Sequence, residues 1–547
     1  AGDRTVNPLR SLLFLALALA VGGRLSQAAE KHARPNIVFI LADDQRADEL
    51  GCTGNPIVKT PNIDRLARHG VLFENSFVTS ASCMPNRTSL LTGQWERRHT
   101  IGWNSDSALS ASQWSATFPM ALKRQGYVVG YLGKNHTPGL RPADFATYYG
   151  SYLGHLGFYP KVRHPILRNA DADTQIEILT EGALDFLEPN AAFRQRIPDD
   201  ARRLLRARPR DRPFLLYVCL NVPHAAGTGS MKQEPSDDAL YRTAYREQLN
   251  QMQPPPGYIA EADVRTPKIP RDVYSGNQIS SYDYRKSVET LRERRVRICQ
   301  TVEGIDRFVG QVAAGLEKLG LADNTIFIYS SDNGILHGEH GYGGKCLLYD
   351  PSIRVPLIIY DPRQPQPAGG RRVPELVVSA DVAPTILELA GVSPVTGIQG
   401  RSLGPFLRGE TADWRKDFFC ESLMLLQEYP LVQGARSHEW KYLRYWPNRR
   451  RPPDYREILD LGIQGETPAY EELFDLRTDP LEQKNLAADS EHADRLAALR
   501  KRCTVLLQEA RAVEPAAPLP SMSAQAWTAE TAAEAKILTQ KSAKAEP

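Results

Sequence analysis

The stretch from Ser82 to Gly93 places a cysteine, a proline and an arginine at alternate positions. It reads S-C-M-P-N-R-T-S-L-L-T-G, with Cys83 two positions before Pro85 and four before Arg87. Pro85 suits the first turn of a helix, because its missing N–H would have no intrahelical partner there. Cys83 is therefore expected where the free N–H groups and the dipole of that helix stabilise an anion. This placement indicates a nucleophile, and a buried structural cysteine at a helix start is the alternative.

Oxygen ligands for a metal ion follow two apolar runs. Residues 36–42 form a continuous β-prone run that ends in Asp43-Asp44, and residues 325–331 lead to Asp332-Asn333. Such runs are typical of strands that are buried on both faces of a parallel sheet, and ligands bind beyond the carboxyl ends of those strands. Carboxylate and amide oxygens suit Ca²⁺ or Mg²⁺ and argue against zinc. A solvated turn is the alternative for the aspartate pair.

Two further apolar runs bring basic side chains to the same edge of the sheet. Residues 127–132 precede Lys134 and His136, and residues 214–220 precede His224, which follows a proline. A histidine after a turn at the end of a strand is a candidate acid or substrate ligand, although it can be structural, and a lysine in a loop is usually only solvated. Lys345 lies in a glycine-rich loop beside an H-x-x-H pair that lacks the helical setting of a zinc protease.

The remaining patterns predict helices and one exposed strand around this core. Apolar residues at helical spacing, with capping or proline signals at some starts, predict helices over 60–67, 117–125, 287–321 and 490–513. Alternating aromatic and charged residues predict a half-exposed strand over Trp440–Tyr445. The proline-rich segment 227–278 has little periodicity, and we interpret it as the rim of a substrate pocket.

Length and composition favour a large exported α/β protein. At 547 residues, with 42% hydrophobic and 24% charged residues, the chain can bury a sizeable core, and its formal charge of +3 gives no field for nucleic acid. Basic residues, an apolar run and small residues predict a signal peptide over 1–29, hence a periplasmic or secreted location and no stable membrane span, and an uncleaved membrane anchor is the alternative. The seven scattered cysteines predict no essential disulfide framework, and residues 514–547 are expected to form a disordered tail.

Five blocks of the chain together resemble the signature of the type I sulfatase family, within the alkaline phosphatase superfamily. These blocks are C-x-P-x-R with L-x-T-G at 83–93, Asp43-Asp44 with T-P-N-I-D-R-L-A from 60, G-K-N-H at 133–136, Asp332-Asn333-Gly334, and E-L-F-D-L from 472 with T-D-P from 478. Asn135 and Thr137-Pro138 depart from the G-K-W-H-x-G that is common in the family. The resemblance implies a mostly parallel sheet sandwiched by helices over residues 30–410, followed by a smaller antiparallel-sheet subdomain over 411–513. It also implies a helix over 377–389, where Asp381 and Pro384-Thr385 fit the D-x-x-P-T pattern of the family.

The resemblance also implies a mechanism. Cys83 would be converted after synthesis to formylglycine by a separate maturing enzyme, and the gem-diol of its hydrate would attack the sulfur of a sulfate ester. Ca²⁺, with Mg²⁺ less favoured, would be held by the modified Cys83 and by Asp43, Asp44, Asp332 and Asn333. Arg87 would hold the gem-diol and the metal carboxylates in place, His136 would help to deprotonate the gem-diol, Lys134 and Lys345 would hold sulfate oxygens, and His224 or Lys345 would protonate the leaving oxygen.

The substrate is less closely defined. Residues 349–354 resemble those of glycan sulfatases, including glucosamine-6-sulfatase-like members, and this favours a sulfated sugar. One alternative is a hydrolase of phosphate or phosphonate esters that uses the same aldehyde. A second alternative is a non-catalytic glycan-binding relative in which Cys83 remains a thiol.

Overall fold

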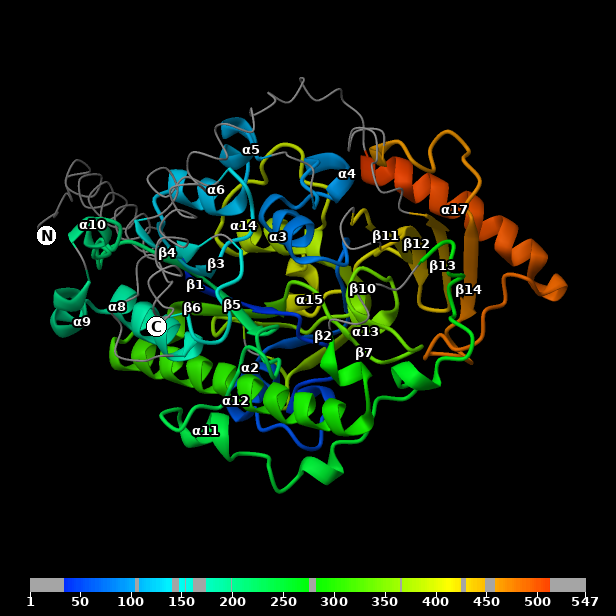
Figure 1. The fold of residues 1–547 in the computed structure, drawn as a ribbon. Coiled ribbons are helices and arrows are strands. Elements are labelled where there is room, and N and C mark those ends of the chain that lie inside the picture. Colours follow the sequence, from blue (N-terminus) through cyan, green and yellow to red (C-terminus); the bar gives the residue numbers. More distant parts are fainter. Residues whose placement is uncertain are drawn as a thin grey trace, which may run out of the picture.

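An eight-stranded mixed sheet forms the centre of the molecule (Figure 1). The computed structural model describes residues 34–103, 108–139, 147–152, 154–160, 174–197, 199–274, 282–364, 366–424, 429–447 and 458–511. The predicted signal peptide over 1–29 and the predicted tail over 514–547 lie outside these residues. Both of them, and the exported location, therefore stay predictions.

The strands of this sheet run in the order β10-β2-β9-β6-β1-β5-β3-β4. Every pairing in it is parallel except the two pairings that β9 makes with β2 and β6. The strands are β1 (Asn36–Asp43), β2 (Val71–Phe77), β3 (Val128–Lys134), β4 (Tyr148–Tyr152), β5 (Phe214–Pro223), β6 (Thr325–Ser331), β9 (Leu357–Tyr360) and β10 (Arg371–Val378).

The apolar strands form the core because helices cover both faces of the sheet. β1 reads N-I-V-F-I-L-A-D and is buried over its whole length. Phe39, Tyr217 and Tyr131 occupy matching positions on β1, β5 and β3, and their rings stack with centroids 4.8 and 4.9 Å apart. This common register brings the carboxyl ends of the three strands to one edge.

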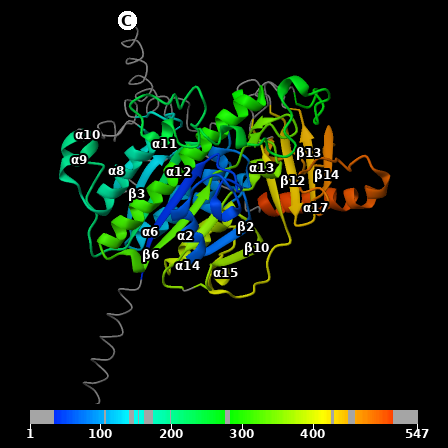
Figure 2. The same ribbon diagram turned by 90° about the horizontal axis from the view of Figure 1, so that it is seen from below.

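Two layers of helices enclose the sheet (Figures 1 and 2). One layer contains α2 (Pro61–His69), α8 (Gln175–Leu187) and α12 (Val288–Lys318), and the other contains α3 (Cys83–Thr92), α6 (Phe118–Arg124) and α14 (Val382–Leu389). The predicted amphipathic helix over 287–321 is confirmed, and a capping box between Ser287 and Thr290 starts it. The predicted helix over 377–389 begins later than expected, because Val377 and Val378 belong to β10.

A four-stranded antiparallel sheet follows in the chain. It consists of β11 (Asp417–Ser422), β12 (Leu431–Ser437), β13 (Trp440–Trp446) and β14 (Tyr470–Asp475), and α17 (Ala493–Arg511) packs on one of its faces. The predicted limit between residues 410 and 411 falls between α15 (Gly404–Arg408) and β11. The domain bounds themselves remain a prediction.

The prediction that Trp440–Tyr445 is half-exposed is wrong, because β13 is buried along its whole length. Trp440 and Tyr442 pack beneath α17, whereas Leu443 and Tyr445 pack into a core shared with the loops of the large sheet. Lys441 is also buried, and its ammonium group pairs with Asp350 and Glu482. The alternation of apolar and charged residues therefore reflects a strand with a core on each side.

The described residues also bear on the cysteines and on membrane insertion. All seven cysteines are free thiols. Among the residues that the structure describes, none of the helices combines the length and the apolar character that a membrane crossing requires.

Candidate active site and metal centre

Four neighbouring parallel strands and one helix bring the predicted side chains together. β6, β1, β5 and β3 lie side by side, and their carboxyl ends lead to Asp332, Asp43, His224 and Lys134 in that order. α3 begins at Cys83, so the helix presents its N-terminus to this edge of the sheet. Strand order, rather than proximity in sequence, therefore assembles the site.

The carboxylates form a compact and fully buried group. Asp43, Asp44, Asp332 and Cys83 each offer one ligand atom, and these four atoms lie within 4.8 Å of one another. The backbone N–H of Asp44 donates to Oδ1 of Asp332 at 3.1 Å, and Nδ2 of Asn333 donates to Oδ1 of Asp44 at 2.6 Å. The group therefore contains the donor atoms that the sequence predicted for a metal ion.

Three cations balance the three carboxylates. Nζ of Lys134 lies 2.5 Å from Oδ2 of Asp43, and Nζ of Lys345 lies 2.5 Å from Oδ1 of Asp44. Nε of Arg87 donates to Oδ2 of Asp332 at 2.7 Å, while its Nη1 donates to the carbonyl oxygen of Lys134 at 2.8 Å. Arg87 thus ties the end of β3 to the carboxylates and fixes the position of Lys134.

Cys83 lies at the centre of these charges. Its Sγ atom is 3.7 Å from Oδ1 of Asp43 and 2.7 Å from Nζ of Lys345. Burial raises the pKa of the thiol, although Lys134 and Lys345 act in the opposite direction. An unmodified Cys83 is therefore a protonated, weakly nucleophilic thiol at neutral pH.

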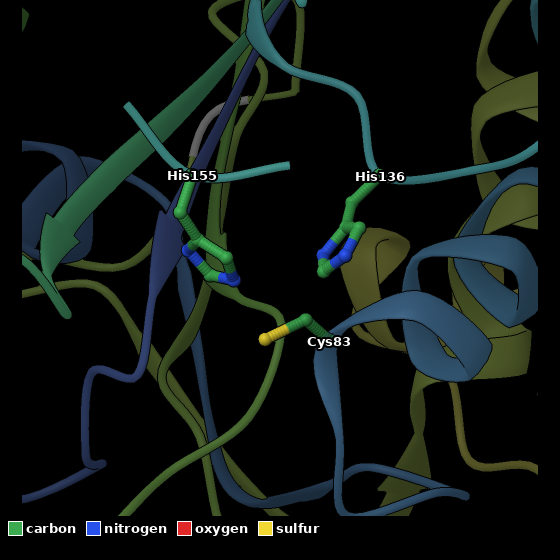
Figure 3. Close-up of side chains that lie close together, drawn as sticks. All are labelled: Cys83, His136 and His155. Carbon is green, nitrogen blue, oxygen red and sulfur yellow. The ribbon is translucent and has the colours of Figure 1, made fainter. Parts of the chain in front are cut away.

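Three imidazoles surround the same point. His136 and His155 lie on one side of Cys83 (Figure 3), and one ring nitrogen of each lies within 4.8 Å of the sulfur. The ring of His155 stacks on that of His224 at a centroid distance of 4.3 Å, and Nε2 of His224 lies 3.7 Å from Oδ2 of Asp44. His224 keeps 31% of its side-chain surface exposed, so it stands at the open side of the site.

Burial and neighbouring charges set the protonation of the site. Burial raises the pKa of Asp44 and of Asp332, whereas the surrounding cations bring the pKa of Asp43 well below its usual value in spite of burial. Burial alone would lower the pKa of Lys345, but Asp44 and Cys83 hold it well above the ordinary value. Lys345 is therefore a fixed positive charge.

Two backbone positions at the site are unusual. Asp44 has φ 63° and His136 has φ 52°, in the left-handed region that non-glycine residues seldom occupy. Such conformations cluster at functional sites, where the surrounding structure maintains them. In this chain they turn the side chains of Asp44 and His136 toward Cys83 immediately after β1 and β3 end.

Comparison with known proteins identifies the family. The model of the sulfatase family matches residues 35–392. The chain belongs to the sulfatase family. The C-terminal part of this sulfatase, residues 338–509, also matches the model described as N-sulphoglucosamine sulphohydrolase, C-terminal. The protein is accordingly a sulfuric ester hydrolase, and the predicted enzyme class is confirmed.

Relatives of this sulfatase span nearly its whole length. N-acetylglucosamine-6-O-sulfatase of Bacteroides thetaiotaomicron is 27% identical over 545 residues, which cover 92% of this chain and 90% of that protein. Human iduronate 2-sulfatase is 29% identical over 552 residues, which cover 89% and 98%. A structure solved in complex with its substrate, D-glucosamine-2-N,6-O-disulfate, aligns with a TM-score of 0.63 at 22% identity and covers 88% of this chain and 99% of that one. The predicted fold is therefore confirmed.

The structure brings every predicted site residue of this sulfatase to the same edge, but the sequence interpretation missed three others. His155 lies between His136 and His224, Asn221 accepts a hydrogen bond from it, and Asn86 donates to the carbonyl oxygen of Asp332 at 2.6 Å. Asn86 lies inside the C-x-P-x-R motif and Asn221 at the end of a predicted strand, so position could have indicated both. For His155 the only signal was the aromatic run that forms β4.

Proposed function

We propose that this sulfatase removes sulfate from a sulfated sugar, using a formylglycine made from Cys83 and a Ca²⁺ ion held by Asp43, Asp44, Asp332 and Asn333. The observation that carries the proposal is the meeting of three carboxylates with Cys83 within 4.8 Å at the start of α3.

The donor set fits a hard divalent cation. Oδ1 of Asn333 is buried and has no hydrogen-bond partner in the structure, while Nδ2 of the same residue is used twice. Burial of an amide oxygen without a hydrogen-bond donor costs free energy unless a cation binds that oxygen. Asp43, Asp44, Asp332 and Asn333 together offer only hard oxygen ligands, and this favours Ca²⁺ over zinc at their group and leaves Mg²⁺ as the second choice. The ion would supply positive charge to draw in the sulfate group.

The surroundings of Cys83 fit its conversion. A thiolate is a soft ligand and matches a hard ion poorly, whereas formylglycine replaces the sulfur with oxygen. When formed, the aldehyde supplies a hydrated oxygen nucleophile that can be regenerated. The free N–H groups at the start of α3 and the ammonium group of Lys345 favour negative charge at this position.

The other side chains have separate roles in this proposal. Lys134 and Lys345 bind sulfate oxygens, and Arg87 holds the carboxylates and the end of β3 in position. His136, which is 4% exposed, is neutral because burial lowers its pKa, so it can accept a proton from the nucleophile. Either His224, which stands at the open side of the site, or Lys345 donates a proton to the leaving oxygen. Burial lowers the pKa of His224, whereas Asp44 and Cys83 raise the pKa of Lys345, so the protonation of these two groups does not single out one acid.

A sulfated amino sugar is the substrate class that we propose. The relative from Bacteroides thetaiotaomicron is named for the 6-O-sulfate of N-acetylglucosamine, and the model matched by residues 338–509 is named for N-sulphoglucosamine. Both names agree with the resemblance of residues 349–354 to glycan sulfatases. The role of residues 227–278 as a pocket rim remains a prediction, and part of that segment lies outside the described residues.

The experiment combines conversion and turnover. Co-expression with a formylglycine-generating enzyme is expected to give a Cys83 peptide whose mass shows the aldehyde, and the converted protein is expected to desulfate sulfated glucosamines in a panel of saccharides. Cys83→Ala should abolish turnover while circular dichroism and thermal unfolding stay unchanged. Turnover retained by Cys83→Ala would refute the nucleophile, and a phosphonate or phosphate ester cleaved faster than the matched sulfate ester would favour the alternative hydrolase.

Calcium binding is tested separately. We expect wild-type protein to gain about 2.7 kcal/mol of stability at a Ca²⁺ concentration about 100 times the dissociation constant. Asp332→Asn keeps the side-chain size but removes one carboxylate, so calorimetric titration should show weaker Ca²⁺ binding. An unchanged dissociation constant would place the ion elsewhere.

A further inference from the structure

A second set of donor atoms meets at Cys83. Sγ of Cys83, one ring nitrogen of His136 and one of His155 lie within 4.8 Å of one another, and Figure 3 shows both imidazoles on the same side of the sulfur. A thiolate and two imidazoles are borderline to soft ligands, unlike the oxygens of the aspartates. The same cysteine therefore stands between two donor sets of opposite chemical preference.

We propose that the unconverted chain, with a thiol at residue 83, binds one Zn²⁺ through Cys83, His136 and His155, and that conversion of Cys83 to formylglycine removes this site. Binding replaces the thiol proton, which passes to solvent, and forms one Zn–S and two Zn–N bonds. Three protein ligands leave the fourth position of the tetrahedron to water. The loss of the zinc site on conversion rests on the proposed conversion of Cys83, whereas zinc binding by the thiol form does not.

His155 has the environment of a metal-ligating histidine. Its Nδ1 lies 3.0 Å from Oδ1 of Asn221, an acceptor, so the ring donates there and leaves the lone pair of Nε2 free. A histidine that binds a metal ion almost always donates its other ring N–H to such an acceptor, which fixes the tautomer and the ring orientation. His155 is also exposed, so one of the three ligands is in contact with solvent.

His136 supplies an independent observation. The residue is 4% exposed, and its Nδ1 atom is buried without a hydrogen-bond partner among the described residues. The edge of Trp103 packs against the ring at a centroid distance of 4.8 Å and limits its rotation. A buried, oriented and partnerless ring nitrogen carries a desolvation cost that coordination would remove.

The three ligand atoms need to move only a short distance toward one another to bind a zinc ion. Zinc bonds of about 2.3 Å to sulfur and about 2.0–2.1 Å to nitrogen place tetrahedral ligands roughly 3.3–3.6 Å apart, so atoms up to 4.8 Å apart must approach by about 1 Å. Side-chain rotations can supply this movement for the exposed His155. Nζ of Lys345 lies 2.7 Å from Sγ, and the thiolate has lone pairs for both the ammonium group and the zinc ion.

Metal titrations test the proposal. The chain is expressed without a maturing enzyme, its thiol is verified by peptide mass, and excess Ca²⁺ occupies the oxygen donors. Zn²⁺ is then titrated against a chromophoric chelator, and Co²⁺ is used as a spectroscopic probe. We expect one site per chain, with a thiolate-to-cobalt charge-transfer band and the visible absorption of tetrahedral Co²⁺.

Variants assign the ligands. Cys83→Ser and His155→Ala should lose the site, and Asn221→Ala should weaken zinc binding by about 10- to 100-fold because it removes the partner that orients His155. His438→Ala, which removes an exposed imidazole on another part of the surface, is the matched control and should bind like wild type. Circular dichroism verifies that each variant is folded.

The outcomes separate this proposal from the proposed function. Zinc binding of equal affinity in folded Cys83→Ser or His155→Ala overturns the ligand assignment, and equal binding by converted protein overturns the loss on conversion. If zinc binding fails while converted protein hydrolyses sulfate esters, only the zinc proposal is refuted. If converted protein is inactive while the thiol form binds zinc as described, only the proposed function is refuted.

Discussion

Lys441→Met is expected to destabilise the protein by about 3 kcal/mol, because Lys441 is a buried charge that joins the two sheets. Its ammonium group is 2.8 Å from Oδ1 of Asp350 and 2.5 Å from Oε1 of Glu482, and its side chain has no exposed surface. Asp350 opens α13 (Asp350–Ile353), which follows the Lys345 loop. Removal of one partner from a buried ion pair costs about 3–5 kcal/mol. Arg436 still pairs with Asp350 at 2.9 Å, so we expect the lower end of that range.

The loss should depend on pH through Glu482. Burial raises the pKa of Glu482 from 4.5 to about 7, even though Lys441 lowers it. A carboxyl group whose pKa is raised by folding stabilises the folded state below its unfolded pKa, and this contribution is lost as the pH rises from about 4.5 to about 7. Without Lys441 the ionised form is still less favourable, so the deficit of the variant should be smaller at about pH 6 than at about pH 8.5.

Urea unfolding followed by tryptophan fluorescence measures these effects at both pH values. Lys501→Met, an exposed lysine on α17, is the control and should stay within about 0.5 kcal/mol of wild type. Adding Glu482→Gln to Lys441→Met removes the unpaired charge and should recover about half of the loss. A deficit below about 1 kcal/mol for Lys441→Met, or one that shrinks as the pH rises, would refute this explanation.

Two further predictions concern the catalytic edge. If His224 is the leaving-group acid, His224→Ala should lose about 10²–10⁴-fold in turnover of a sugar sulfate but much less on an aryl sulfate with a good leaving group, whereas Lys345→Ala should lose activity on both. Steady-state rates on the two substrates test this prediction. Equal losses on both substrates for His224→Ala would contradict the assignment. Gly133→Ala should cost about 3 kcal/mol or more in urea unfolding, since its φ is 83° and a Cβ atom would lie 1.9 Å from the carbonyl oxygen of Cys219. Gly154→Ala, with φ 85° and open space, isolates the backbone term of about 1–2 kcal/mol, and a similar cost for both variants would show that the contact has no effect.

The central strands and their polar ends could be predicted because both signals are local. A continuous apolar run followed at once by Asp43 or Asp332 indicates a buried strand and a ligand at its carboxyl end, whatever the rest of the chain does. Strand order was not available from the same residues. The convergence of Asp43 with Asp332 depends on the direct pairing of β1 with β6 over a separation of almost 300 residues.

The errors arose where burial depends on distant partners. The charged positions of β13 indicate exposure, but Lys441 is buried because two carboxylates from other segments neutralise it. His155 was missed because its neighbours in sequence carry no motif, and its importance follows from the path of the chain after β4, which brings its ring onto that of His224 after β5. The surroundings of Lys441 and His155 depend on residues distant in sequence, and the periodicity of the sequence gives no information about such contacts.

If Cys83 is converted as proposed, its depth in the fold sets an order of events during biosynthesis. The residue has no exposed surface once α3 has docked against the ends of the central strands. A maturing enzyme that must bind the backbone around residue 83 could act only on a chain in which α3 has not yet docked. Oxidation of Cys83 would therefore compete with the docking of α3. A newly made molecule in which α3 docks first would keep Cys83 as a thiol for as long as it remains folded.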